Sequence, residues 1–167
     1  MTEKIFRNYL ELKSFEGLKE VKKPLEDYFV ELVKPKDFQL NKFFYKNIGK
    51  NYQWIDRLVW TDFEWVRYVD DKKLSTYVLK NNDEIVGYFE LIFNQDTKES
   101  EIAYFGILEE YFGKKLGGYL LSEAIKTSFT LGSLRIWVHT CSLDHGNALN
   151  NYLSRGMKIF KSEILIR

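Results

Sequence analysis

The stretch "EEYFGKKLGGYLL", residues 109–121, places three glycines and two lysines between two apolar segments. The segment before it, "EIAYFGIL" (101–108), predicts a β-strand, and the segment after it, "LGGYLLSEAIKTSF" (116–129), predicts an α-helix. Glycines allow a ligand to approach the backbone closely, and a helix N-terminus offers unpaired N–H groups with a partial positive charge. The turn is therefore either an ordinary strand-to-helix connection with solvated lysines or a phosphate-binding site.

Outside this turn, the composition is that of an ordinary globular domain. The chain has 167 residues, of which 45% are hydrophobic and 29% charged, and its net charge is +1. We interpret residues 1–167 as a single domain, with residues 1–27 as an N-terminal extension that could form an extra hairpin. Because the charges are balanced along the chain, neither a nucleic acid nor a membrane surface is expected as a partner.

Cysteine and histidine are scarce, which limits metal and thiol chemistry. Cys141 is the single cysteine, so an intramolecular disulfide is excluded and a reducing compartment is indicated. The two histidines, His139 and His145, have no spacing that matches a zinc site. The first residues lack the apolar core of a signal peptide, and no apolar run reaches the ~20 residues of a transmembrane helix. We therefore expect a cytoplasmic protein without a metal.

The hydrophobic pattern predicts alternating strands and helices. Strands are expected at 4–13, 28–34, 74–80, 85–93, 100–108, 134–140 and 158–166. Helices are expected at 36–47, 62–70, 115–131 and 144–156. The helix at 62–70 follows the capping-box pattern Thr61–Glu64, and the helix at 144–156 is expected to start at Asp144. The strands 74–108 are joined by short turns and should be antiparallel. The helix 115–131 should cross over to make 134–140 parallel to 100–108, which gives an α/β (α+β) fold with a mixed sheet.

Two blocks of sequence carry a resemblance to a known family. The first is the turn Phe112–Gly118, and the second is 144–157, "DHGNALNNYLSRGM", with Tyr152 and Gly156 at a characteristic spacing. Together they resemble the GCN5-related N-acetyltransferase superfamily over residues 28–166. In that family's signature, Arg or Gln stands at the position of Phe112 and Gly at the position of Lys115, so the chain departs from it twice. Gly117 matches the last glycine of the signature.

The resemblance implies a mixed, mostly antiparallel sheet flanked by helices, with a parallel strand pair that splays at the cofactor site. It also implies transfer of an acetyl group from acetyl-CoA (coenzyme A) to a primary amine of a small molecule or peptide. Two copies could pair as a homodimer. The cofactor residues that it implies are Phe105, Gly106, Ile107, Leu108, Phe112, Gly113, Lys114, Lys115, Leu116, Gly117, Gly118, Asn147 and Tyr152.

Within this set, the turn and the preceding strand have distinct expected roles. Backbone N–H groups at the glycines would hold the pyrophosphate, and Lys114 and Lys115 could replace the missing arginine. Lys115 is compatible with this role provided that its φ is negative. Gly106 either leaves one face of its strand open for the pantetheine arm or reflects tight packing.

The resemblance also assigns the acid and the base. Tyr152 matches the general acid that protonates the leaving thiolate. Glu101 is the expected general base, two pleats from Phe105 and on the same face of the strand. Glu90 on the neighbouring strand competes for this role and is a substrate-binding candidate together with His139, and a water relay is a further alternative.

Two other functions compete with acetyl transfer. The departures at Phe112 and Lys115 would suit an acyl-CoA-binding module without turnover. His139 and Cys141 share one strand face and would suit a thiol enzyme, although no orienting element accompanies them. The acceptor is open among a small amine, an amino acid, a peptide terminus and an aminoglycoside. The aromatic stretch 52–68 is expected to form part of its wall.

Overall fold

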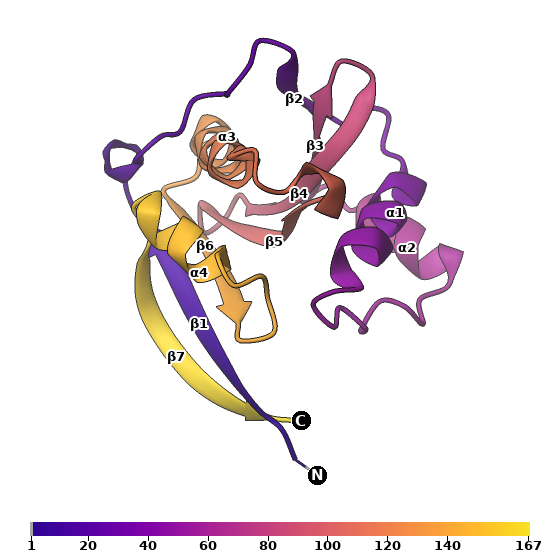
Figure 1. Cartoon of the computed structure of the whole chain (residues 1–167), viewed down its shortest axis with the longest axis vertical. Helices are drawn as coiled ribbons and strands as arrows, with labels where there is room; N and C mark the ends of the chain where they lie inside the picture. Colours follow the sequence, from indigo (N-terminus) through magenta and orange to yellow (C-terminus); the bar gives the residue numbers. More distant parts are fainter. Residues whose placement is uncertain (1) are drawn as a thin grey trace.

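The chain folds into a seven-stranded sheet with helices on both faces (Figure 1), and the computed structural model describes residues 2–167. The strand order is β2-β3-β4-β5-β6-β1-β7. The strands are β1 (Lys4–Leu12), β2 (Tyr28–Leu32), β3 (Leu74–Asn81), β4 (Glu84–Asn94), β5 (Glu99–Ile107), β6 (Arg135–Cys141) and β7 (Lys158–Ile166). The helices are α1 (Phe38–Gly49), α2 (Asp62–Val69), α3 (Leu116–Thr130) and α4 (Ala148–Ser154), with 3-10 turns at Phe15–Gly17 and Glu109–Tyr111.

The mixed and mostly antiparallel sheet is confirmed, including the parallel pair. β5 and β6 pair in parallel at their beginnings, where Glu101 lies opposite Trp137 in the last pair of this ladder. Beyond that pair the described residues of the two strands are not bonded to each other, while β6 continues its pairing with β1 as far as Cys141. The two parallel strands therefore splay apart, and the unpaired edge of β5 faces the opening.

The N-terminal strand β1 is an interior strand of the sheet, next to the edge strand β7, and this arrangement differs from the extra hairpin considered for residues 1–27. β1 lies between β6 and β7 and pairs antiparallel with both, with Leu10 opposite Val138. Leu10 is fully buried in the main core. The apolar pattern of this segment indicated a strand, but a strand's partners depend on contacts made far along the chain, which a local pattern does not encode.

Each face of the sheet has its own core. On one face, α3 buries Leu120, Leu121 and Ile125 against β1, β4 and β6. On the other face, the Phe44 ring of α1 stacks on the Tyr88 ring of β4 with centroids 4.6 Å apart. Figure 1 shows α1 and α2 beside the half of the sheet that holds β3 and β4, whereas α3 and α4 lie toward the other half. The α1–α2 helices therefore leave the far part of their face open.

Helix starts agree with the sequence at α2 and differ from it at α4. The predicted capping box is present, because the Thr61 side chain accepts from the Glu64 N–H at 3.2 Å. The expected cap at Asp144 is wrong, since α4 begins only at Ala148. The Asp144 carboxylate instead accepts hydrogen bonds from the Cys141 N–H at 3.0 Å and the Thr140 hydroxyl at 2.5 Å. Asp144 thus closes the turn after β6 instead of capping a helix, and both are common uses of an aspartate side chain.

Candidate active site

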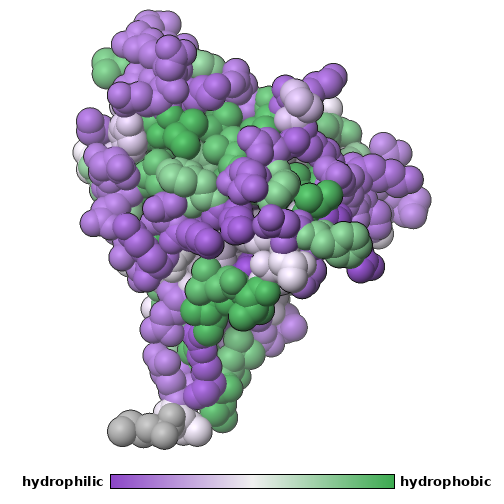
Figure 2. Space-filling view, turned by 90° about the vertical axis from the view of Figure 1, so that its right-hand side faces the viewer, coloured by the Kyte–Doolittle hydropathy of each residue, from purple (hydrophilic) through white to green (hydrophobic). Residues whose placement is uncertain are grey.

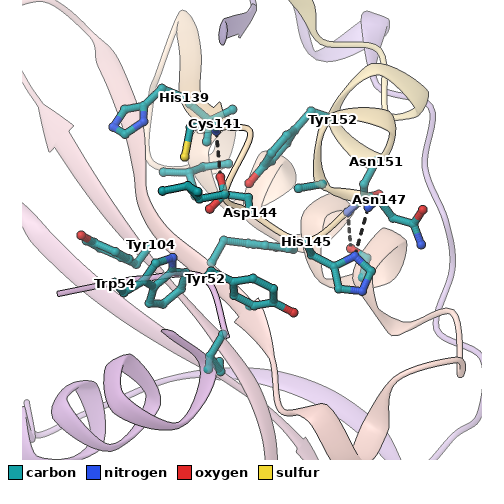
Figure 3. A pocket seen from close by; sticks show the side chains of 18 of the residues that line it. Tyr52, Trp54, Tyr104, His139, Cys141, Asp144, His145, Asn147, Asn151 and Tyr152 are labelled. Atoms are coloured by element: carbon teal, nitrogen blue, oxygen red, sulfur yellow. Dashed lines mark hydrogen bonds between the residues drawn. The ribbon is translucent and has the colours of Figure 1, made fainter. Parts of the chain in front are cut away.

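One large open cavity, of about 1220 Å³, occupies the region where β5 and β6 separate. Its walls come from both splayed strands, the turn after β5, the loop before α4 and the loop after α1 (Figure 3). Most of the predicted site residues line it: Glu101, Phe105, Gly106, Ile107, Phe112, Gly113, Lys115, Leu116, Gly117, Gly118, His139, Asn147 and Tyr152. Glu90, Leu108 and Lys114 do not line it.

The turn before α3 is built around two residues with positive φ. Gly113 has a φ of 80° and Lys115 a φ of 59°, so the condition stated for Lys115, a negative φ, is not met. Lys115 adopts the left-handed conformation that glycine adopts most readily. No side chain caps α3, and its first turn therefore presents N–H groups to the cavity. This geometry agrees with an anion site.

Two residues of the second sequence block, both overlooked in the sequence analysis, reach this turn from α4. The Asn151 amide donates to the Gly117 carbonyl at 3.1 Å, which joins α4 to the first turn of α3. The Arg155 guanidinium lies against Gly118, where an added Cβ would collide with it. Its Nε is buried and has no hydrogen-bond partner among residues 2–167, and burial lowers the pKa of Arg155. The i, i+4 spacing of Asn151 and Arg155 places both side chains on one face of a helix, and this was the sequence signal that they act at the same place.

Tyr152 places its ring in the core and its hydroxyl at the cavity. The ring lies 6.3 Å from that of Phe105, and the side chain is 6% exposed. Figure 3 shows the hydroxyl directed into the cavity between α4 and the end of β6. Burial raises the pKa of Tyr152, and the nearby charge of Asp144 raises it further. The phenol therefore stays protonated at neutral pH and can donate a proton.

Glu101 lies on the face of the sheet opposite to the one expected. A β-bulge at Ala103 interrupts the pairing of β5 with β4, and beyond it Phe105 packs in the same core as Ile102. Since neighbours in a strand alternate, Glu101 faces the α1–α2 side, away from Phe105. Burial raises the pKa of Glu101, and Arg57 partly opposes this. A half-buried carboxylate with a raised pKa is a suitable proton acceptor.

Glu90 is a buried structural residue rather than a base or a substrate ligand. It is 0% exposed and pairs with Arg57, whose Nη1 lies 3.2 Å from its carboxylate. It also accepts from the Tyr68 hydroxyl at 2.7 Å and the Asn41 amide at 2.8 Å. Arg57 is further enclosed by aromatic rings, with Tyr104 at 4.2 Å. With its carboxylate engaged in this way, Glu90 does not reach the cavity.

The remaining differences concern side chains close to the turn. Leu108 is buried, and its N–H donates to the Val86 carbonyl at 2.8 Å, so it is not free for a ligand. The Lys114 ammonium lies over the Tyr111 ring at 5.8 Å. A Cβ at Gly106 would approach the Ile48 side chain to 2.7 Å, which supports the tight-packing interpretation of this glycine.

His139 and Cys141 line the cavity from β6 without the features of a nucleophilic pair. The His139 ring lies 5.6 Å from that of Tyr9, and burial lowers the pKa of His139 with a contribution from Arg7. Burial raises the pKa of the Cys141 thiol. A nucleophilic cysteine requires a lowered pKa, so the geometry does not favour the thiol-enzyme alternative.

Aromatic side chains close the cavity on the side of the loop after α1. Trp54 and Tyr104 meet edge to face with centroids 4.8 Å apart, and Tyr52 lies beside them (Figure 3). His145 bridges across, with its ring 5.1 Å from Phe112 and 6.1 Å from Tyr52. Phe112 thus packs under the loop before α4. Of the aromatic residues in the stretch 52–68, Tyr52, Trp54 and Tyr68 line the cavity.

Residues 37–157 match the sequence model of the Acetyltransferase (GNAT) family. The chain belongs to this family. No curated protein matches the sequence significantly. Membership of the GNAT family supports acyl transfer as the general chemistry of the cavity.

Solved structures with the same fold are distant in sequence. The GCN5-related N-acetyltransferase from Kribbella flavida aligns with a TM-score of 0.69 and 13% identity over 99% of this chain and 58% of that one. The corresponding enzyme from Sphaerobacter thermophilus aligns with a TM-score of 0.72 and 13% identity over 97% of this chain and 50% of that one. An aminoglycoside acetyltransferase from an uncultured soil metagenomic sample aligns with a TM-score of 0.63 and 12% identity over 77% of this chain and 87% of that one. The chain thus spans only about half of the first two proteins.

Residues 2–167 contain no group of three or more His, Cys, Asp and Glu side chains placed to hold a metal ion. None of the helices in this range is both long and apolar enough to cross a membrane.

Proposed function

We propose that this GNAT protein transfers an acetyl group from acetyl-CoA directly to a primary amine of a small molecule or peptide. The observation that carries the proposal is the pairing of a proton donor and a proton acceptor at one gap in the sheet. Tyr152 lines the cavity from α4, and Glu101 lines it from the last residue pair before β5 and β6 separate. Direct transfer to an amine requires both functions.

The residues around the turn are suited to coenzyme A. The uncapped start of α3 and the open space at Gly113 and Gly117 suit a pyrophosphate, since a Cβ at either glycine meets no backbone. The Arg155 guanidinium, which lines the cavity beside this turn, provides a further donor for a phosphate. The unpaired edge of β5 offers backbone groups to an extended pantetheine arm.

When bound, acetyl-CoA supplies an acetyl thioester as the group to be transferred. Glu101, or a water that it orients, accepts the proton that the acceptor ammonium loses before its nitrogen forms the new C–N bond. Tyr152 would donate its proton to the sulfur as the C–S bond breaks, and the second proton of the attacking nitrogen would return to the Tyr152 oxygen through solvent, which gives free thiol, an amide and a reprotonated Tyr152. The raised pKa of Glu101 suits its role, because Glu101 binds a proton more readily than an ordinary carboxylate, and Tyr152 is in its protonated form at neutral pH.

Product detection tests the proposal. The chain is incubated with acetyl-CoA and a panel of primary amines, and mass spectrometry is used to find an acceptor heavier by one acetyl group while thiol release is followed in parallel. We expect stoichiometric amide and thiol. If acetyl-CoA raises the melting temperature but no amine in the panel is acetylated, the chain is an acyl-CoA-binding module and the proposed transfer is wrong.

A further inference from the structure

Apolar and aromatic side chains form a continuous part of the cavity wall on the side of the α1–α2 helices, although Arg7, Arg57 and Arg167 also line this end. The apolar and aromatic side chains, from the loop after α1, from β4 and β5, and from β7, are Trp54, Ile55, Ile92, Tyr104, Leu165 and Ile166. Figure 2, which turns the α1–α2 side toward the viewer, shows hydrophobic atoms at mid-height and down the narrow lower part, which Figure 1 shows to be formed by β1 and β7. An apolar wall recognises an apolar surface.

Trp54 is held in place by the end of α1. Its backbone N–H donates to the Gly49 carbonyl at 3.2 Å, and a Cβ at Gly49 would lie 2.5 Å from the Trp54 Cβ. The loop thus folds tightly over the end of α1, and Tyr104 supports the indole from β5 at 4.8 Å between centroids. An indole held in this way presents a flat apolar surface at small entropic cost.

Negative charge is sparse at the same end. Its carboxylates are Glu101, which is half-buried, and Asp56, which lies on the exposed loop. The Asp144 carboxylate is engaged by hydrogen bonds from its own turn, and Arg57 and Arg7 are paired with Glu90 and Glu163. Arg167, which donates to the Gln53 side chain at 3.1 Å, adds a positive charge at this end and disfavours a polycation further. One half-buried carboxylate matches one ammonium, whereas a polycation would need several carboxylates to replace the water around its charges.

We infer that the acceptor is a monoamine with an apolar body, an alkyl or aryl group that lies against Trp54 and Tyr104 while its ammonium lies at Glu101. This inference rests on the proposed function and narrows the acceptor of that reaction. It sets the expected acceptor apart from an aminoglycoside, the class of compound after which two of the structural neighbours are named.

Three amines test this inference: 2-phenylethylamine, ethanolamine and kanamycin, with coenzyme A release and acetylated product both measured. We expect kcat/KM for 2-phenylethylamine to exceed that for ethanolamine by at least about tenfold, because only the former covers the apolar wall. Kanamycin should not be acetylated above the background rate. Trp54→Ala should raise KM for 2-phenylethylamine about tenfold and leave ethanolamine nearly unaffected.

Two further variants distinguish a change in acceptor preference from a loss of folding. Val59→Ala, on the same loop but outside the cavity, should behave as wild type. Ile55→Ser, at an exposed position of the wall, should shift KM in the same direction as Trp54→Ala without unfolding the chain. Preferred acetylation of kanamycin or ethanolamine, or an unchanged KM in both wall variants, would overturn the inference while leaving acetyl transfer intact. Binding of acetyl-CoA without acetylation of any of these or other amines would overturn both.

Discussion

At the scale of single residues, Tyr152 combines a fixed ring with a proton that is hard to remove. Its ring is packed in the main core, while its hydroxyl forms no hydrogen bond among residues 2–167 and is directed into the cavity (Figure 3). Because burial raises the pKa of Tyr152, the donor form predominates across the neutral range. The residue is therefore positioned by packing, and its hydroxyl carries the proton that the proposed role requires.

Tyr152→Phe removes only the hydroxyl and should lower kcat by roughly 10²–10⁴, the usual contribution of general acid catalysis. The dissociation constant of acetyl-CoA, measured by calorimetry, should stay nearly the same, since the ring packing is kept. Tyr77→Phe is the matched control, because Tyr77 packs against the same core but does not line the cavity. A kcat close to wild type in Tyr152→Phe would mean that another group or solvent protonates the thiolate.

At the scale of elements, one buried network joins four segments of the chain. Glu90 on β4 binds Asn41 of α1, Arg57 of the loop after α1 and Tyr68 of α2. This network holds the helices and the cavity wall against the sheet. Removing one partner of a buried ion pair leaves the other charge uncompensated, which costs more than the pair contributes.

Glu90→Gln should therefore lower the free energy of unfolding by about 3 kcal/mol, measured by urea denaturation. The control is Glu99→Gln, which removes a partner of Arg135 on the neighbouring strand at a largely solvated site. Its cost should be below about 1 kcal/mol. Equal effects of the two substitutions would show that the Glu90 network does not hold the helices.

The turn before α3 carries backbone strain that can be measured. Lys115 has a φ of 59°, and a left-handed conformation costs a residue with a Cβ about 1–2 kcal/mol relative to glycine. Lys115→Gly should therefore stabilise the protein by about 1 kcal/mol and raise the melting temperature by about 2–4 °C. Lys114→Gly, one position earlier and without a positive φ, should give no such gain. A lower melting temperature for Lys115→Gly would contradict this assignment.

At the scale of the whole molecule, sequence patterns located the elements better than their partners. Apolar periodicity placed the strands and helices close to their observed bounds, because burial of one face imposes that periodicity. The insertion of β1 between β6 and β7 was not accessible, since it depends on long-range pairing. The bulge at Ala103 moved Glu101 to the other face for the same reason.

The candidate site was predictable where a backbone motif defines it and not where tertiary contacts do. The glycine turn and Tyr152 follow from short-range spacing, and both line the cavity. The Glu90–Arg57 pair arises from a contact between residues 33 apart in sequence, so nothing in the pattern around Glu90 indicated its burial. Arg155 was overlooked because its neighbour across the fold, Gly118, lies on another helix.

The most direct test of the account is the thermal shift produced by acetyl-CoA in a glycine variant of the turn. Gly117→Val should fold, because its φ is not positive and its Cβ would meet only the Asn151 amide at 3.6 Å, yet the side chain would fill the space assigned to the pyrophosphate. Gly146→Val, at an open position outside the cavity, is the control. We expect acetyl-CoA to raise the melting temperature of wild type and Gly146→Val but not of Gly117→Val. An equal rise in all three would contradict a cofactor site at the start of α3.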